Sequence, residues 1–204
     1  MVAGLIWLGC TVTVADAHAL FGAERHSTAE TRIVANFAQF AGSEANAWHL
    51  FSGLREGRAI TLVAPARDGG TAKTVTFTPP TPSMGYLSAF LSLGLARQQL
   101  AMHGIKRPAP GQIEAALSGG TIVGPFAGPV ELPGVLRLRA EGAGWDRVAA
   151  AMGVKLSAVV SEARSEMLAS TGGDVNAAGS PMKAVWYLDY RGAMTGRGSP
   201  LPTR

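Results

Sequence analysis

Glycine limits what this chain can fold into. The chain has 204 residues, of which 26 are glycine. Runs of helical spacing stop at Gly42, Gly57 and Gly104. Because glycine readily adopts the left-handed conformation that ends a helix, the sequence predicts several short helices.

The composition favours helices over sheets. Hydrophobic residues make up 47% of the chain but aromatic residues only 7%, so the core consists mainly of Ala, Leu and Val, which pack well between helices. The segment that opens at Gly85 is apolar on more than one side, as is typical of a central helix. Apolar spacing and helix-capping residues such as Ser43 predict helices over 28–40, 43–57, 85–104, 110–118 and 135–140.

Two hairpins interrupt the helices. β-branched residues over 59–63 and 74–78 flank the turn sequence Arg67-Asp68-Gly69-Gly70, which is a strong hairpin signal. A second, poorer hairpin pairs 121–123 with 129–132. The predicted fold is therefore α+β and mainly helical, with short helices and two small hairpins.

The order of these elements suggests an internal duplication. A helix ending at glycine, a hairpin, a proline and a helix opened by glycine and an aromatic residue occur in 43–104 and again in 110–164. Gly85-Tyr86 and Gly144-Trp145 occupy matching places. Sequence identity between the halves is low, so the alternative is that only the element order matches.

The second half ends in a pattern that resembles a helix-turn-helix. Ala149, Gly153 and Val159 supply a small residue at the helix crossing, a glycine for the turn and an apolar anchor on the second helix. A DNA reader needs polar and basic groups on that second helix, but the segment from Lys155 to Arg164 is nearly neutral. Nucleic acid is therefore disfavoured, and the pair is expected to serve structure or protein contact. The expected partner-contact residues are Trp145, Lys155, Leu156 and Arg164.

The N-terminus has the character of a secretory leader. Residues 1–19 carry an apolar run around Leu5-Ile6-Trp7-Leu8 and end in Ala17-His18-Ala19, which fits cleavage after Ala19 or after Ala17. The missing basic region before the apolar run leaves a non-exported apolar N-terminus as the alternative. We expect a signal peptide over 1–19, a flexible segment over 20–27, one compact domain over 28–169 and a flexible tail over 170–204. The expected location is periplasmic or secreted, with no stable membrane span.

Cys10 is the only cysteine, and it lies within the predicted leader. The mature chain would then have no disulfide, thiol nucleophile or cysteine metal site. A lipoprotein cleaved before Cys10 is the weaker alternative, because Trp7 replaces the aliphatic residue expected upstream. The net charge of +4 permits weak attraction to anionic surfaces without demanding it.

No motif for catalysis, cofactor or metal binding emerges. The mature histidines, His26, His49 and His103, have no partner at a metal-ligand spacing. The chain also lacks the Gly-x-Ser-x-Gly elbow and the Gly-Lys-Ser/Thr ending of a phosphate loop. Two carboxylate pairs, Glu44 with Glu56 and Glu141 with Asp146, are better explained as helix-terminal charges. We therefore predict no catalytic residue, no cofactor and no metal.

Three stretches carry a resemblance: 84–86 with its leucine-rich helix, 111–121, and Gly142-Ala143-Gly144-Trp145-Asp146-Arg147-Val148-Ala149. They resemble a group of exported proteobacterial proteins of unknown function, in which the last stretch typically reads Gly-x-Gly-Trp-Gly-x-Ile-Ala. Asp146 and Val148 depart from that pattern. The resemblance covers 40–164 and implies export and one compact unit.

These observations lead to one expected function and two rivals. We expect an exported, non-enzymatic binding or structural module with an unknown protein partner in the cell envelope. The first rival is a cytoplasmic helix-turn-helix DNA-binding protein, if 1–19 is not a signal. The second is a hydrolase whose site is assembled from distant residues.

Overall fold

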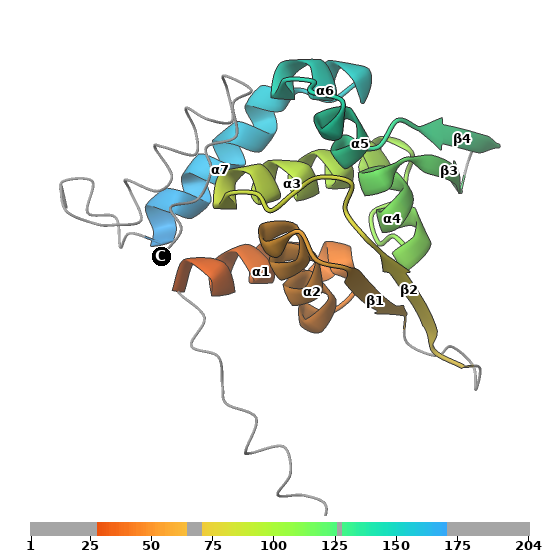
Figure 1. Ribbon diagram of the computed structural model, residues 1–204, viewed down its shortest axis with the longest axis horizontal. Coiled ribbons are helices and arrows are strands. Elements are labelled where there is room, and N and C mark those ends of the chain that lie inside the picture. The colour runs from red at the N-terminus through yellow and green to blue at the C-terminus, as the bar shows by residue number, and fades with distance from the viewer. Residues whose placement is uncertain (1–27, 65–70, 126–127, 171–204) are drawn as a thin grey trace, which may run out of the picture.

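The computed structural model describes residues 28–64, 71–125 and 128–170 (Figure 1). In this part of the chain, the fold is α+β and mainly helical, with two antiparallel two-stranded sheets, as predicted. The predicted signal peptide, the segment 20–27 and the tail beyond residue 170 lie outside the described residues. The elements are α1 (Thr28–Ala41), α2 (Glu44–Glu56), β1 (Ile60–Ala64), β2 (Lys73–Phe77), α3 (Tyr86–Met102), α4 (Pro110–Ser118), β3 (Gly120–Val123), β4 (Pro129–Leu132), α5 (Val135–Ala140), α6 (Trp145–Ala151) and α7 (Leu156–Ser170).

Helix α3 lies at the centre of the molecule (Figure 1). Its side chains are buried on every side, from Leu87 to Leu100, and it contacts α1, α2, α4, α5 and α7. This confirms the prediction that the helix after Gly85 is central, because a helix without a polar face has no side to turn toward water. These five helices cover it.

The glycines end helices as the sequence predicts. Gly42, Gly57 and Gly104 all have positive φ, between 65° and 84°. At the start of α2, the Ser43 hydroxyl accepts a hydrogen bond of 3.1 Å from the Asn46 backbone N–H, which satisfies one of the free donors of a helix N-terminus. Helix boundaries could therefore be predicted from local chemistry.

Both predicted hairpins form, and each contributes one face to the core. Strands β1 and β2 pair with Leu62 opposite Val75, and each is displaced by one residue from the predicted range. Strands β3 and β4 pair with Ile122 opposite Val130. Figure 1 shows both hairpins projecting from the same end of the molecule. Residues 65–70, which include the predicted turn, lie outside the described residues.

The same contact holds each hairpin to the helix before it. Asn46 is the third residue of α2, and its side-chain amide binds the backbone of Val63 in β1, with N–H and carbonyl distances of 3.0 and 2.9 Å. Gln112 is the third residue of α4, and its Nε2 donates to the carbonyl of Val123 in β3 at 3.3 Å. The duplication of 43–104 and 110–164 stays a prediction, and this shared contact supports it.

Arg97 of α3 joins three helices. Its guanidinium donates to the backbone and side-chain oxygens of Asn36 in α1, pairs with Glu162 of α7, and lies 4.6 Å from the centre of the Phe37 ring. Three partners on two helices fix the positions of α1 and α7 relative to the centre. Within the described residues, every helix is too short or too polar to cross a membrane.

Candidate functional site

The helix-turn-helix is built from α6 and α7, joined at Gly153. The Gly153 N–H bonds to the Ala150 carbonyl at 3.0 Å, and the Val154 N–H bonds to the Ala149 carbonyl at 2.9 Å. This pair of bonds is the Schellman helix ending, which requires a left-handed residue, and Gly153 has a φ of +69°. The predicted turn is therefore present at the predicted residue.

The predicted anchor residues of this helix pair are also buried. Ala149 is 2% exposed and Val159 is fully buried. Val159 packs against Gly94 of α3, so that a side chain starting at Gly94 would lie 2.5 Å from its Cγ1 atom. The helix pair is thus seated on the central helix through its second member.

Trp145 is a core residue, which corrects its placement among the contact residues. Its side chain is 2% exposed, and the Arg139 guanidinium lies 4.6 Å from the centre of the ring. Arg139 also donates to the Ala143 carbonyl at 2.5 Å, and burial lowers its pKa. The Trp145 Nε1 atom has no hydrogen-bond partner among the described residues. In the folded chain, the ring therefore offers no surface to a partner, since its large apolar area is buried in the core.

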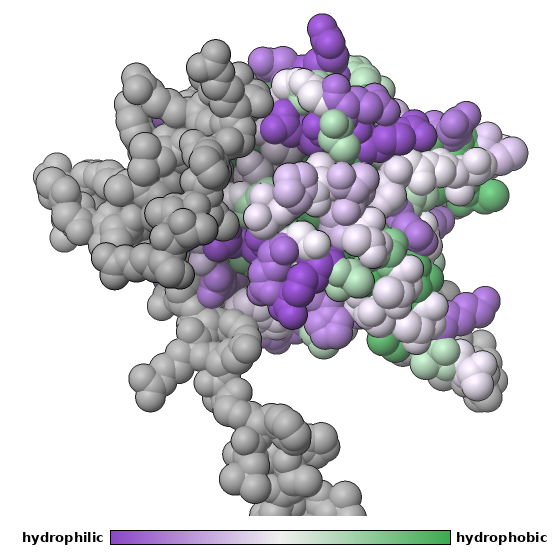
Figure 2. All heavy atoms as spheres, viewed as in Figure 1, coloured by the Kyte–Doolittle hydropathy of each residue, from purple (hydrophilic) through white to green (hydrophobic). Residues whose placement is uncertain are grey.

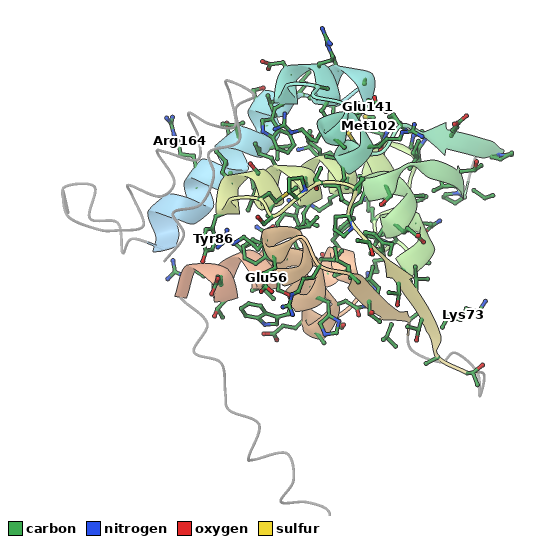
Figure 3. The ribbon with its side chains drawn as sticks, viewed as in Figure 1. Glu56, Lys73, Tyr86, Met102, Glu141 and Arg164 are labelled. Atoms are coloured by element: carbon green, nitrogen blue, oxygen red, sulfur yellow. The ribbon has the colours of Figure 1, made fainter. Side chains whose placement is uncertain are left out.

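The other three predicted contact residues reach the surface, but not at one place. Lys155 and Arg164 are exposed, whereas Leu156 is partly buried against the core. Lys155 precedes the first turn of α7 and Arg164 lies about 13 Å further along the helix. Figure 3 shows Arg164 on α7, well away from Met102 at the end of α3. Lys155 and Leu156 therefore belong to one surface and Arg164 to another.

Met102 is the surface residue that the sequence did not reveal. It is 56% exposed at the end of α3, and its Cε atom lies 3.5 Å from the position where a Gly153 side chain would begin. Because α3 is apolar on all sides, nothing in its pattern separates this exposed methionine from its buried leucines. We call Met102, Gly153, Lys155 and Leu156 the turn surface.

Helix α7 presents few groups that could read DNA. Its exposed residues near the turn are Ser157, Ala158 and Ser161, and Glu162 is committed to Arg97. Base recognition relies on long amide and basic side chains. Helix α7 therefore occupies the place of a recognition helix, but near the turn it lacks the long amide and basic side chains that recognise bases.

The carboxylates of the two pairs noted in the sequence lie at helix ends, where they were expected. Glu44 and Glu56 lie at opposite ends of α2, about 18 Å apart along the axis, and Glu56 pairs with Arg58 at the surface. Glu141 and Asp146 are both exposed, the first at the end of α5 and the second in the first turn of α6.

The histidines that lie in the described chain have structural surroundings. His49 Nδ1 lies 2.8 Å from the Thr61 carbonyl and therefore holds α2 against β1. His103 follows α3, and its backbone N–H donates a hydrogen bond to the Leu100 carbonyl at the helix end. The described residues contain no group of three or more His, Cys, Asp or Glu side chains placed to hold a metal ion.

Comparison with known proteins gives no relative. No protein-family model, no curated protein and no solved structure matches the chain.

Proposed function

We propose that this protein is an exported, non-enzymatic module that binds a protein of the cell envelope through the turn surface. The observation that carries the proposal is the exposure of Met102 beside Gly153. A methionine side chain is flexible and polarizable, so it adapts to the shape of a partner. Complete burial of such a side chain contributes about 1.5–3 kcal/mol, and a partner could recover the share that belongs to the exposed 56% of Met102.

The surroundings of Met102 suit protein contact. Two and three residues after Gly153, the turn surface adds the exposed charge of Lys155 and the half-buried apolar side chain of Leu156. Interfaces commonly combine an apolar centre with a polar rim. In addition, Val123 in the second hairpin is 66% exposed. The next residue, Gly124, lies beside the backbone carbonyl of His103, which follows Met102 in the sequence. The apolar surface can therefore extend toward the second hairpin, at whose outer end Figure 2 shows hydrophobic side chains.

Site-specific crosslinking tests this proposal. A photo-crosslinking amino acid at position 102 in the exported protein should give a discrete adduct with one envelope protein. The same amino acid at Ala45, which is exposed on α2, should not. The purified partner should then bind at least tenfold more weakly to Met102→Glu. Equal adducts at both positions, or unchanged binding by Met102→Glu, would contradict the proposal.

DNA binding is the second candidate, favoured by one observation, the helix-turn-helix geometry at Gly153. Fluorescence anisotropy with a random 30-base-pair duplex at 50 mM salt measures it. If α7 served as a recognition helix, a steep loss of affinity with rising salt would follow, because phosphate contacts release counterions. Under the proposed function we expect weak binding that Lys155→Ala leaves unchanged.

Export is tested separately. Cleavage after Ala19 gives a mature chain that begins at Leu20, and cleavage after Ala17 gives one that begins at His18. Mass spectrometry of the protein from a fractionated cell should find one of these ends in the periplasm or medium. Intact Met1 in the cytoplasm would contradict export and strengthen the DNA-binding candidate.

A further inference from the structure

The two edges of the first hairpin differ. The outer edge of β1 is closed by α2, because Asn46 binds both backbone groups of Val63 and His49 binds the carbonyl of Thr61. In an antiparallel pair, residues whose backbone groups point outward stand opposite residues that also point outward. Val63 pairs with Thr74, and Thr61 pairs with Thr76.

The backbone N–H and carbonyl groups of Thr74 and Thr76 therefore point away from β1, along the outer edge of β2. The 3.0 Å contact between the hydroxyls of Thr61 and Thr76 agrees with this, since outward-pointing pairs bring their side chains closest. Both threonines are exposed, and within the described residues no hydrogen bond from outside the hairpin reaches their backbones. The edge offers two donors and two acceptors at the spacing of an extended chain.

The second hairpin has no comparable edge. Gln112 binds the carbonyl of Val123, and Val123 stands opposite Pro129. Pro129 thus occupies in β4 the outward-pointing place that Thr74 occupies in β2. Proline has no N–H to donate, and it is a common means of blocking an edge strand.

We propose that the edge of β2 binds an extended segment of a partner protein, which adds to the sheet as an antiparallel third strand. Main-chain hydrogen bonds from Thr74 and Thr76 would supply the affinity. Lys73 at the tip of the hairpin (Figure 3) is exposed and makes no ion pair within the described chain. The segment accordingly carries an acidic residue near the C-terminal end that faces Lys73.

A second copy of this chain fits the edge less well. Self-pairing centred on Val75 would set Lys73 opposite Phe77, where it meets no negative charge. A five-residue strand also buries far less than the roughly 1,200 Å² of a small stable interface between folded proteins. A peptide segment avoids both difficulties, because it can match the charge and does not need a second folded surface.

The test uses an acetylated and amidated peptide, Val-Thr-Val-Thr-Asp, titrated into the full-length mature protein and followed by backbone NMR. We expect millimolar or tighter binding, shifts centred on the amides of Thr74 and Thr76, and slower exchange of both amides with solvent. Replacing the peptide's acidic residue by Lys should weaken binding several-fold.

Matched variants make the test specific. Thr74→Pro removes an outward-pointing N–H and no hydrogen bond between β1 and β2, so the hairpin should stay folded while peptide binding falls at least tenfold. Thr74→Val keeps that N–H and should bind like the wild type, as should Met102→Glu, which alters a different surface and tests the proposed function instead. Equal binding by Thr74→Pro, or no binding by the wild type, would overturn the proposal. Concentration-dependent protection of Thr74 and Thr76 without peptide would also overturn it, in favour of a dimer.

Discussion

Gly94 lies in the middle of α3, where glycine is usually a poor choice. In an exposed helix, alanine would be more stable by roughly 0.5–1 kcal/mol. Here Val159 of α7 occupies the space that the alanine methyl group would need, at 2.5 Å. Overpacking of a core costs about 1–3 kcal/mol, so the clash outweighs the gain in helix propensity.

We therefore expect Gly94→Ala to lower the free energy of unfolding by about 1–2 kcal/mol. Urea denaturation measures this change. The control is a double-mutant cycle with Val159→Ala, in which the double variant should be more stable than the sum of the two single effects implies. Additive effects would mean that the two residues do not meet.

Gly153 depends on its backbone conformation rather than on space. A side chain there would meet only the Met102 Cε atom, at an ordinary contact distance of 3.5 Å, but the φ of +69° disfavours any branched residue. We expect Gly153→Val to lower the free energy of unfolding by about 1–3 kcal/mol. Gly153→Asn should cost much less, because asparagine tolerates the left-handed region. Thermal melting compares the two variants, and equal melting temperatures would exclude the left-handed turn.

At the scale of the elements, the amides that hold the hairpins should differ in strength. Asn46 is 4% exposed and makes three side-chain hydrogen bonds, to Ala41 and twice to Val63. Gln112 makes two, with Ala109 and Val123, near the surface. An unsatisfied buried group costs about 1–3 kcal/mol, whereas an ordinary hydrogen bond contributes about 1 kcal/mol.

Asn46→Ala should therefore destabilise the protein by about 2–4 kcal/mol, and Gln112→Ala by about 1 kcal/mol or less. Urea denaturation gives both values. Hydrogen exchange shows where Asn46→Ala acts, because the Val63 amide should exchange faster with solvent once its hydrogen bond to Asn46 is lost. An intact Val63 amide in Asn46→Ala would show that another group closes the β1 edge.

The elements were predictable where their signals are local. Ser43, Gly153 and the β-branched strands act on neighbours within a few residues, so their roles could be read directly. The Asn46 contact with Val63 spans 17 residues, and it depends on how α2 lies against β1, which no local pattern encodes. For the same reason, Trp145 was placed on the surface and Met102 was missed, because burial is decided by the packing of whole helices.

At the scale of the whole molecule, Tyr86 ties the first helix to the central one. Its hydroxyl donates to Glu30 Oε1 of α1 at 2.6 Å, and Arg55 of α2 lies 3.7 Å from the centre of its ring. Burial raises the pKa of Tyr86 above its ordinary value of 10.0, and the hydrogen bond to Glu30 adds to the increase, against the smaller opposing effect of Arg55. The contact joins α3 to two helices that precede it by about 30 residues or more.

The raised pKa fixes the direction of an alkaline effect. Above pH 10.0 the unfolded chain releases the Tyr86 proton before the folded chain does, so the stabilisation by this group is complete below that pH and is lost as the pH rises through the folded-state pKa.

Tyr86→Phe removes the hydroxyl and should cost about 1 kcal/mol at pH 8. The stability difference between the wild type and Tyr86→Phe should then shrink as the pH rises toward 11, since both proteins share all other titrating groups. In Glu30→Gln, which keeps an acceptor without the charge, the folded-state pKa of Tyr86 is raised less, so the decline should be smaller and should end at lower pH. Guanidinium denaturation at pH 8, 9, 10 and 11 measures all three proteins. A constant difference between wild type and Tyr86→Phe over this range would show that the pKa of Tyr86 is not raised in the folded chain.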